Sequence, residues 1–184
     1  MTHSARADDE DADLALIQRW QAGDERAATA LVSRHAPALA RFAASLGEWE
    51  HVDEIVQDTF VRAFGSLESF RQESTLRTWL FTILRRLVLD RRRAARRGGE
   101  AVALEDVELA TEHGPLDGVI ADETRGRVDA AVRGLTRMQR EVFTLRVSEG
   151  LSYKEIADVL GSTEGAARVH YHNALRAVKE ALND

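Results

Sequence analysis

Apolar side chains recur every three or four residues along most of the chain, and this period constrains the fold more than any other feature. Such spacing places apolar residues on one face of an α-helix. Only two prolines and twelve glycines occur among the 184 residues, so few helix breakers interrupt the pattern. The sequence therefore predicts an all-α protein.

The helical pattern falls into two blocks, which predicts two helical domains. We expect helices on either side of Gly23-Asp24, a helix beginning at Pro37, and a long helix that ends before Gly98-Gly99. Further helices are expected near residues 52–65, 124–134, 137–149, 152–160 and 163–182. The predicted division is an acidic tail over 1–13, a first domain over 14–97, an acidic flexible linker over 98–123 and a second domain over 124–184.

Charge is sharply partitioned along the chain, although the net charge is only −6. Residues 85–97 carry seven arginines and one aspartate, whereas residues 100–123 carry eight acidic side chains and no Lys or Arg. Exposed charges act within about 8–10 Å of one another, so these blocks act locally. The arginines predict an anionic partner. The acidic linker suggests the hypothesis that its carboxylates compete with phosphates for the arginines in the free protein.

The segment from residue 151 to 182 is typical of a helix-turn-helix. Ser152 and Glu155 form a capping box, and Gly161 can adopt the left-handed conformation that ends the first helix. In a helix-turn-helix, the second helix lies in the DNA major groove. The side chains placed for base or phosphate contact are Glu164, Arg168, His172 and Asn173. A plain helical hairpin is the alternative interpretation.

The segment from residue 70 to 86 interleaves aromatic and arginine side chains: Phe70, Trp79 and Phe81 occur with Arg71, Arg77, Arg85 and Arg86. This combination suits single-stranded nucleic acid, because bases stack on rings while guanidinium groups hold the backbone. For Trp79 the alternative is a position in the core, beside the Leu76 and Leu80 stripe.

Polar side chains also follow one face of the helix expected over 52–65. Glu54, Asp58 and Arg62 are four residues apart. This pattern fits either a solvated salt bridge or a protein-docking face, and the spacing alone does not choose between them.

Catalysis and metal binding find little support. The chain has no cysteine, which excludes disulfides and Cys-ligated zinc, and it has no Gly-rich phosphate loop, G-x-S-x-G or H-E-x-x-H motif. His170 and His172 diverge on a helix, and we expect the other histidines, His35 among them, in loops or exposed positions. We therefore expect no enzyme, no metal and no cofactor. No apolar run is long enough for membrane insertion, and the N-terminus lacks a secretion signal, so a cytoplasmic location is expected.

Taken in order, these segments resemble the small alternative sigma factors of bacterial RNA polymerase, of the extracytoplasmic-function (ECF) type. DEIVQDTFVRAF (53–64) is similar to sigma region 2.2, FRQESTLRTWLFTILRRLVLDRRR (70–93) to regions 2.3 and 2.4, and YKEIADVLGSTEGAARVHYHNALRAVK (153–179) to region 4.2. The resemblance implies a region 2 helical bundle and a region 4 helix-turn-helix. It also implies a protein that binds core RNA polymerase, recognises promoter DNA, opens it for transcription initiation and is held inactive by an anti-sigma factor.

The resemblance assigns site residues by position. Core polymerase binding is carried over to Glu54, Gln57, Asp58 and Arg62. Contact with the unpaired −10 element is carried over to Phe70, Arg71, Gln72, Glu73, Ser74, Thr78, Trp79, Arg85 and Arg86. Contact with the duplex −35 element is carried over to Ser162, Thr163, Glu164, Arg168, His172, Asn173 and Arg176.

The chain departs from the family pattern at three places. Gln72 stands where Gly is usual, Arg86 stands where Asn is common, and ARVHYHNA (167–174) replaces the common VKSRLHRA. Two alternatives to a sigma factor stay open at this point. One is a stand-alone helix-turn-helix regulator, and the other is a decoy that mimics a sigma factor to sequester a regulator.

Overall fold

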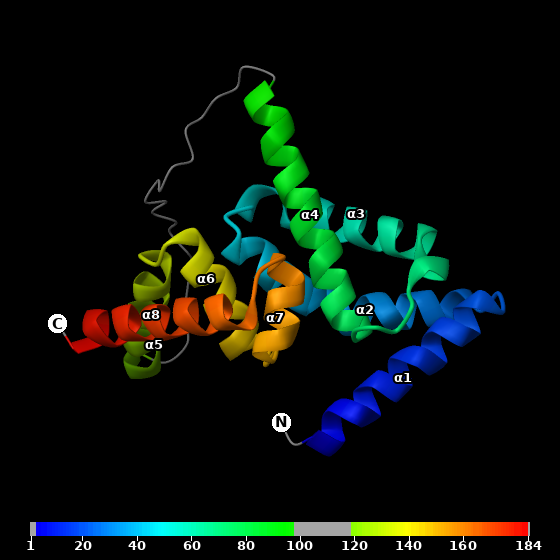
Figure 1. The fold of residues 1–184 in the computed structure, drawn as a ribbon, viewed down its shortest axis with the longest axis horizontal. Helices are drawn as coiled ribbons and strands as arrows, with labels where there is room; N and C mark the ends of the chain where they lie inside the picture. Colours follow the sequence, from blue (N-terminus) through cyan, green and yellow to red (C-terminus); the bar gives the residue numbers. More distant parts are fainter. Residues whose placement is uncertain (1–2, 98–118, 184) are drawn as a thin grey trace.

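The computed structural model describes the backbone of residues 3–97 and 119–183 and the side chains of residues 8–97 and 126–183. Every regular element within these ranges is helical, which confirms the all-α prediction (Figure 1). The longer helices are α1 (His3–Gln21), α2 (Glu25–Ser45), α3 (Val52–Gly65), α4 (Leu76–Arg97), α5 (Val119–Arg133), α6 (Arg137–Phe143), α7 (Tyr153–Leu160) and α8 (Glu164–Asn183). Short turns η1 (Trp49–His51), η2 (Leu67–Ser69) and η3 (Thr144–Ser148) complete the set.

The predicted linker falls mostly outside the described residues. Its last residues, from Val119 onward, begin α5. The hypothesis that its carboxylates compete for the arginines therefore stays a hypothesis. No described helix is both long and apolar enough to cross a membrane.

The break predicted at Gly23-Asp24 is confirmed. The Asp24 carboxylate caps α2 by accepting a hydrogen bond from the Arg26 backbone N–H at 3.0 Å, and it pairs with Arg19 at 2.7 Å. The hydrogen bond from Arg19 lowers the pKa of Asp24 below its usual value. Gly23 has a φ of 93°, which only glycine adopts without strain. The chain therefore reverses here and lays α1 along α2.

The acidic stretch predicted as a tail is largely part of α1, which begins at His3. Asp9 and Asp13 pair with Arg34 of α2 at 2.6 and 3.1 Å. Asp13 also lies 3.0 Å from Nε2 of His35, and both side chains are buried. The expectation of an exposed or loop position for His35 is thus wrong, because α1 folds back and covers it.

The prediction that Pro37 begins a helix is wrong, because α2 runs through it from Glu25 to Ser45. A proline inside a helix removes the hydrogen bond to the carbonyl four residues earlier, here that of Ser33. Pro37 and Ser33 are both exposed, so water can satisfy this carbonyl. The opposite face of α2 buries Leu31, Leu39 and Phe42, and this packing outweighs the local cost.

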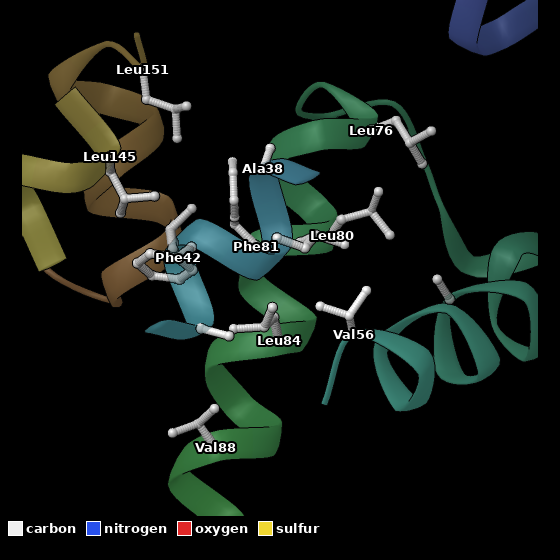
Figure 2. Packing of buried hydrophobic residues seen from close by; sticks show 14 of the residues in the cluster. Ala38, Phe42, Val56, Leu76, Leu80, Phe81, Leu84, Val88, Leu145 and Leu151 are labelled. Atoms are coloured by element: carbon white, nitrogen blue, oxygen red, sulfur yellow. The ribbon is translucent and has the colours of Figure 1, made fainter. Parts of the chain in front are cut away.

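The long helix α4 occupies the middle of the molecule, with α3 on one side and α7 on the other (Figure 1). Its buried residues share one hydrophobic cluster with α2 and with the C-terminal helices. The rings of Phe42 and Phe81 meet edge to face at 5.2 Å, and Leu145 and Leu151 belong to the same cluster (Figure 2). The two halves of the chain therefore pack against each other.

The helix expected over 137–149 is only partly α-helical. It starts at a capping box on Thr136, is α-helical to Phe143, and continues as the π-helical turn η3. The wider turn buries Leu145, whose carbonyl accepts a hydrogen bond from the Leu151 N–H at 2.9 Å. A smaller apolar cluster, around Leu135, Ala174 and Val178, holds α5 against α8.

Candidate nucleic-acid and protein interfaces

The helix-turn-helix predicted in the C-terminal half has the expected local geometry. In the capping box of α7, the Ser152 hydroxyl accepts from the Glu155 N–H at 3.2 Å, and the Glu155 carboxylate accepts from the Ser152 N–H at 2.7 Å. Gly161 has φ 62° and ψ 42°, the left-handed conformation that ends α7. The Thr163 hydroxyl accepts from the Ala166 N–H at 3.1 Å at the start of α8. These caps fix the angle between the two helices.

The outer face of α8 is exposed and carries most of the predicted duplex contacts. Ala167 and Ala174 are fully buried against the other helices, which turns the opposite face outward. The exposed set is Ser162, Thr163, Glu164, Arg168, His172 and Arg176, whereas Asn173 is half-buried. Val169, which is 59% exposed, lies among them. Arg168 therefore lies near the amino end of α8, on the exposed face that a recognition helix turns towards the DNA major groove.

Tyr153 organises two cations beside this face. The guanidinium carbon of Arg168 lies 4.6 Å from the centroid of the Tyr153 ring, and that of Arg146 lies 4.8 Å from it. Arg146 also donates to the Leu151 carbonyl at 2.7 Å. A cation over a tyrosine ring is attracted by the ring quadrupole, so the ring limits where these side chains can lie. The sequence alone does not indicate Arg146 and Tyr153, because their closeness to Arg168 depends on the fold.

The loop before α4 brings aromatic and charged side chains together. Phe70 and Trp79 pack with ring centroids 5.1 Å apart and are half-buried against the core. Trp79 therefore fits both interpretations, a core residue and a base-stacking ring: one part packs inward and another reaches the surface. Arg71, Gln72 and Glu73 are exposed, and Ser74 is half-buried.

Gln72 has a φ of 58°, the left-handed region. Among the described residues it is the only non-glycine with a positive φ. A side chain costs about 1 kcal/mol there, whereas glycine adopts this conformation freely. The loop thus keeps a backbone shape suited to glycine while carrying an amide side chain.

Thr78 and Arg85, both assigned to the −10 contact, face the C-terminal half of the chain. Thr78 is 1% exposed, and its hydroxyl lies 3.4 Å from Oε1 of Glu155. Arg85 donates from Nε to Oε2 of Glu141 at 2.9 Å and from Nη1 to the Leu160 carbonyl at 3.2 Å. Arg86, about 100° further around α4, is exposed. In this conformation the predicted −10 face is divided between solvent and the second half of the chain.

A second buried carboxylate, Glu149, lies at the same contact. Arg41 of α2 donates to both of its oxygens, from Nε at 2.8 Å and from Nη2 at 3.1 Å. Arg77 of α4 also pairs with Oε2. The hydrogen bonds that Arg41 donates to Glu149 raise the pKa of the Arg41 guanidinium above its usual value. Nothing local in the sequence marks Glu141 and Glu149 as buried, or Arg41 as the partner of Glu149.

The polar face of α3 is exposed, as the docking interpretation requires. Glu54, Gln57 and Arg62 point to solvent, Asp58 is half-buried, and Val61 is 64% exposed between them. Glu54 pairs with Arg91 of α4 at 3.0 Å, and this hydrogen bond holds the pKa of Glu54 below its usual value. The face therefore combines a fixed negative charge with an exposed apolar side chain, a composition that suits a protein partner.

The arginine block of α4 divides between arginines that pair with other elements and arginines such as Arg93, which pairs with Asp90 of the same helix at 2.5 Å. Arg91 and Arg92 pair with acids outside α4, and Arg92 lies 3.2 Å from Glu48. Towards the end of the helix, Arg93, Arg96 and Arg97 line an open hollow together with Asp90. No group of three or more histidines or acids placed to hold a metal occurs in the parts of the chain that the structure describes.

Comparison with known proteins matches both halves of the chain to domains of one kind. Sigma-70 region 2 matches residues 31–98, and Sigma-70 region 4 matches residues 125–178. The ECF RNA polymerase sigma-E factor of Haemophilus influenzae is 29% identical over 179 residues, covering 92% of this chain and 95% of that protein. The sigma-E factor of Escherichia coli K12 is 30% identical over 175 residues, covering 90% of this chain and 92% of that protein.

Two solved structures resemble this fold over most of its length. The sigma factor RpoE from Bartonella quintana, in complex with the anti-sigma factor NepR, has a TM-score of 0.66 at 29% identity and covers 84% of this chain and 96% of that chain. CnrH, in complex with the cytosolic domain of CnrY, has a TM-score of 0.65 at 31% identity and covers 94% of this chain and 97% of that chain.

Proposed function

The chain belongs to the extracytoplasmic-function family of RNA polymerase sigma factors, and from this premise we propose how its surfaces divide the work of promoter recognition. As an alternative sigma factor it directs transcription initiation. The observation that carries the proposal is the presence of two separate DNA-suited surfaces on one chain: the outer face of α8, and the loop and first turns of α4.

The outer face of α8 reads the duplex −35 element. Its amino end carries the exposed residues Glu164 and Arg168, and the Tyr153 ring directs Arg168 and Arg146 to the same place. Cations held in position near a helix that enters the major groove bind phosphates and fix the register of the helix on the DNA. Ser162, Thr163, His172, Asn173 and Arg176 complete this surface.

The loop from Phe70 to Ser74 and the adjoining face of α4 hold the unpaired strand of the −10 element. The Phe70–Trp79 pair offers an aromatic platform for a flipped base, and Arg71 and Arg86 offer exposed cations for the backbone. Thr78 and Arg85 join this surface once the C-terminal half moves away. The side-chain amide of Gln72 contributes hydrogen-bonding groups that a glycine at this position would lack.

The exposed face of α3 binds core RNA polymerase through Glu54, Gln57, Asp58 and Arg62, with Val61 as its apolar centre. An anti-sigma factor holds the protein inactive, and the complex of the similar sigma factor RpoE with the anti-sigma factor NepR supports this part of the proposal. The protein acts in the cytoplasm, where its polymerase is, and has no catalytic activity of its own.

Reconstitution with core polymerase tests this assignment. The assembled holoenzyme should produce transcripts from a defined promoter and should make thymines near the start site reactive to permanganate. Arg71→Ala should reduce permanganate reactivity, whereas Arg26→Ala, at an exposed position on α2, should leave it unchanged. A holoenzyme that opens no promoter would overturn the sigma assignment and favour the decoy. Specific promoter binding without polymerase would favour the stand-alone regulator, which the match of both halves of the chain does not support.

A further inference from the structure

The acids Glu141 and Glu149 lie in the C-terminal half but are buried against α2 and α4 of the N-terminal half. Their side chains are fully inaccessible to solvent, and their partners are Arg85, Arg41 and Arg77. We propose that this contact is a latch: Glu141 and Glu149 close the C-terminal half over part of the −10 face of α4, so that the free protein shields that face from unpaired DNA. The inference rests on the function proposed above for α4.

The carboxylates of the latch and the phosphates of DNA bind arginine in the same way. A guanidinium group binds a carboxylate and a phosphate through the same fork of N–H donors. Arg85 is engaged by Glu141 and by the Leu160 carbonyl, and Arg77 is engaged by Glu149. A DNA backbone that approached this side of α4 would have to replace these carboxylates. The C-terminal half and the DNA strand therefore compete for one surface.

The ion pairs hold the two halves together but leave the contact able to open. Burying an ion pair returns little net stability, but neutralising one partner leaves the other charge without its counter-ion and weakens the contact. Oε1 of Glu141 accepts no hydrogen bond within the described structure, although Arg137 lies 3.4 Å away. The Arg41 side chain is 52% exposed, which leaves one edge of the Glu149 pair open to water. A partner that supplies better ligands for the arginines can displace these acids.

The latch shields only one of the two DNA-suited surfaces. In the closed state Arg168, Val169 and His172 remain exposed on α8. Opening should therefore strengthen binding to single-stranded DNA without changing binding to duplex DNA. Competition by the acidic linker, acting on exposed arginines in general, would not make this distinction.

The test uses the full-length protein with Glu141→Gln and Glu149→Gln, singly and together, since glutamine keeps the shape and removes the charge. Asp158→Asn is the matched control: it removes an acid from the same half of the chain, one whose ion-pair partner among the described residues is Lys154, 3.4 Å away on the surface. Arg41→Gln releases Glu149 from the other side. Arg41 is largely exposed and lies outside the proposed DNA surface, so this variant keeps the test valid if a glutamate variant fails to fold.

Two measurements are made on each variant. The chain has no native cysteine, so Ala30→Cys and Lys179→Cys, both at exposed positions, allow fluorophores to report the separation of the halves by energy transfer. Fluorescence anisotropy measures binding to an oligothymidylate of about ten nucleotides and to a duplex of similar length.

In the double Glu→Gln variant, energy transfer should fall and affinity for the oligothymidylate should rise about tenfold, because the binding-competent fraction increases. Duplex affinity should change by less than about twofold in the same variant.

Unchanged energy transfer in all of the latch variants would overturn the proposal, as would the same response in Asp158→Asn. A fall in energy transfer without a gain in oligothymidylate affinity would show that the latch does not cover a DNA-binding face, which also overturns it. Failure of the proposed function has a different signature. The latch variants would still open, while the holoenzyme would leave promoter thymines unreactive to permanganate.

Discussion

Removal of the Arg85 guanidinium is expected to destabilise the protein far more than removal of its neighbour Arg86. Arg85→Ala leaves the fully buried Glu141 carboxylate with only Arg137, which lies 3.4 Å away and is 48% exposed. Stranding one member of a buried ion pair typically costs about 3–5 kcal/mol. Since Arg137 can compensate in part, we expect Arg85→Ala to lower the free energy of unfolding by about 3 kcal/mol.

Urea denaturation followed by far-UV circular dichroism measures this loss. Arg86→Ala is the control, because Arg86 is exposed and its removal should change the free energy of unfolding by less than about 0.5 kcal/mol. Adding Glu141→Gln to Arg85→Ala should restore more than half of the loss, since no buried charge is then left unpaired.

Equal, small effects of Arg85→Ala and Arg86→Ala would refute this reasoning. That result would mean that the Glu141 carboxylate is solvated in the folded protein and that the contact between α4 and the C-terminal half does not persist in solution. A large loss that Glu141→Gln does not restore would instead point to the packing of the Arg85 stem and its hydrogen bond to the Leu160 carbonyl.

Three further predictions concern the individual surfaces. Arg168→Ala should weaken duplex binding and reduce the slope of log affinity against log salt by about one, and an unchanged slope would remove Arg168 from the phosphate contacts. Glu54→Gln should lower stability at neutral pH, because the hydrogen bond from Arg91 keeps the pKa of Glu54 below its usual 4.5. The ionised form is the one favoured by folding, so this difference from wild type should be present above about pH 4.5 and disappear as the pH falls through the lowered pKa, as followed by thermal melts. A difference that persists in acid would contradict the ion-pair explanation. Gln72→Gly should raise the free energy of unfolding by up to about 1 kcal/mol by relieving the positive φ, whereas a clear loss in a denaturant titration would show that the glutamine side chain makes a stabilising contact.

Most helices of this protein could be predicted from local signals. The capping box of Ser152 and Glu155, the left-handed Gly161 and the break at Gly23-Asp24 all appear in the structure as expected. Each depends on a few consecutive residues, whose side chains satisfy the free backbone groups at a helix end. Local chemistry of this kind can be read without knowledge of the rest of the chain.

Predictions failed where packing opposed a local preference. Pro37 is a helix breaker by its own chemistry, but Leu39 and Phe42 beside it are buried so well that α2 continues. The buried position of His35 depends on Asp13, which only the reversal of α1 brings within reach. In both cases distant apolar and polar contacts outweigh the preference of the residue itself.

The order of motifs along the chain determined what kind of protein this is. Helix periodicity, the aromatic and arginine segment and the capped turn each lie within a short stretch, and together they indicated two helical domains suited to DNA. Only the tertiary structure decided which of those residues are free to bind. Arg85 and Arg86 are neighbours in sequence, yet one is held by Glu141 and the other faces solvent. Their difference arises because burial and ion pairing depend on residues far away in the chain, and no local pattern carries that information.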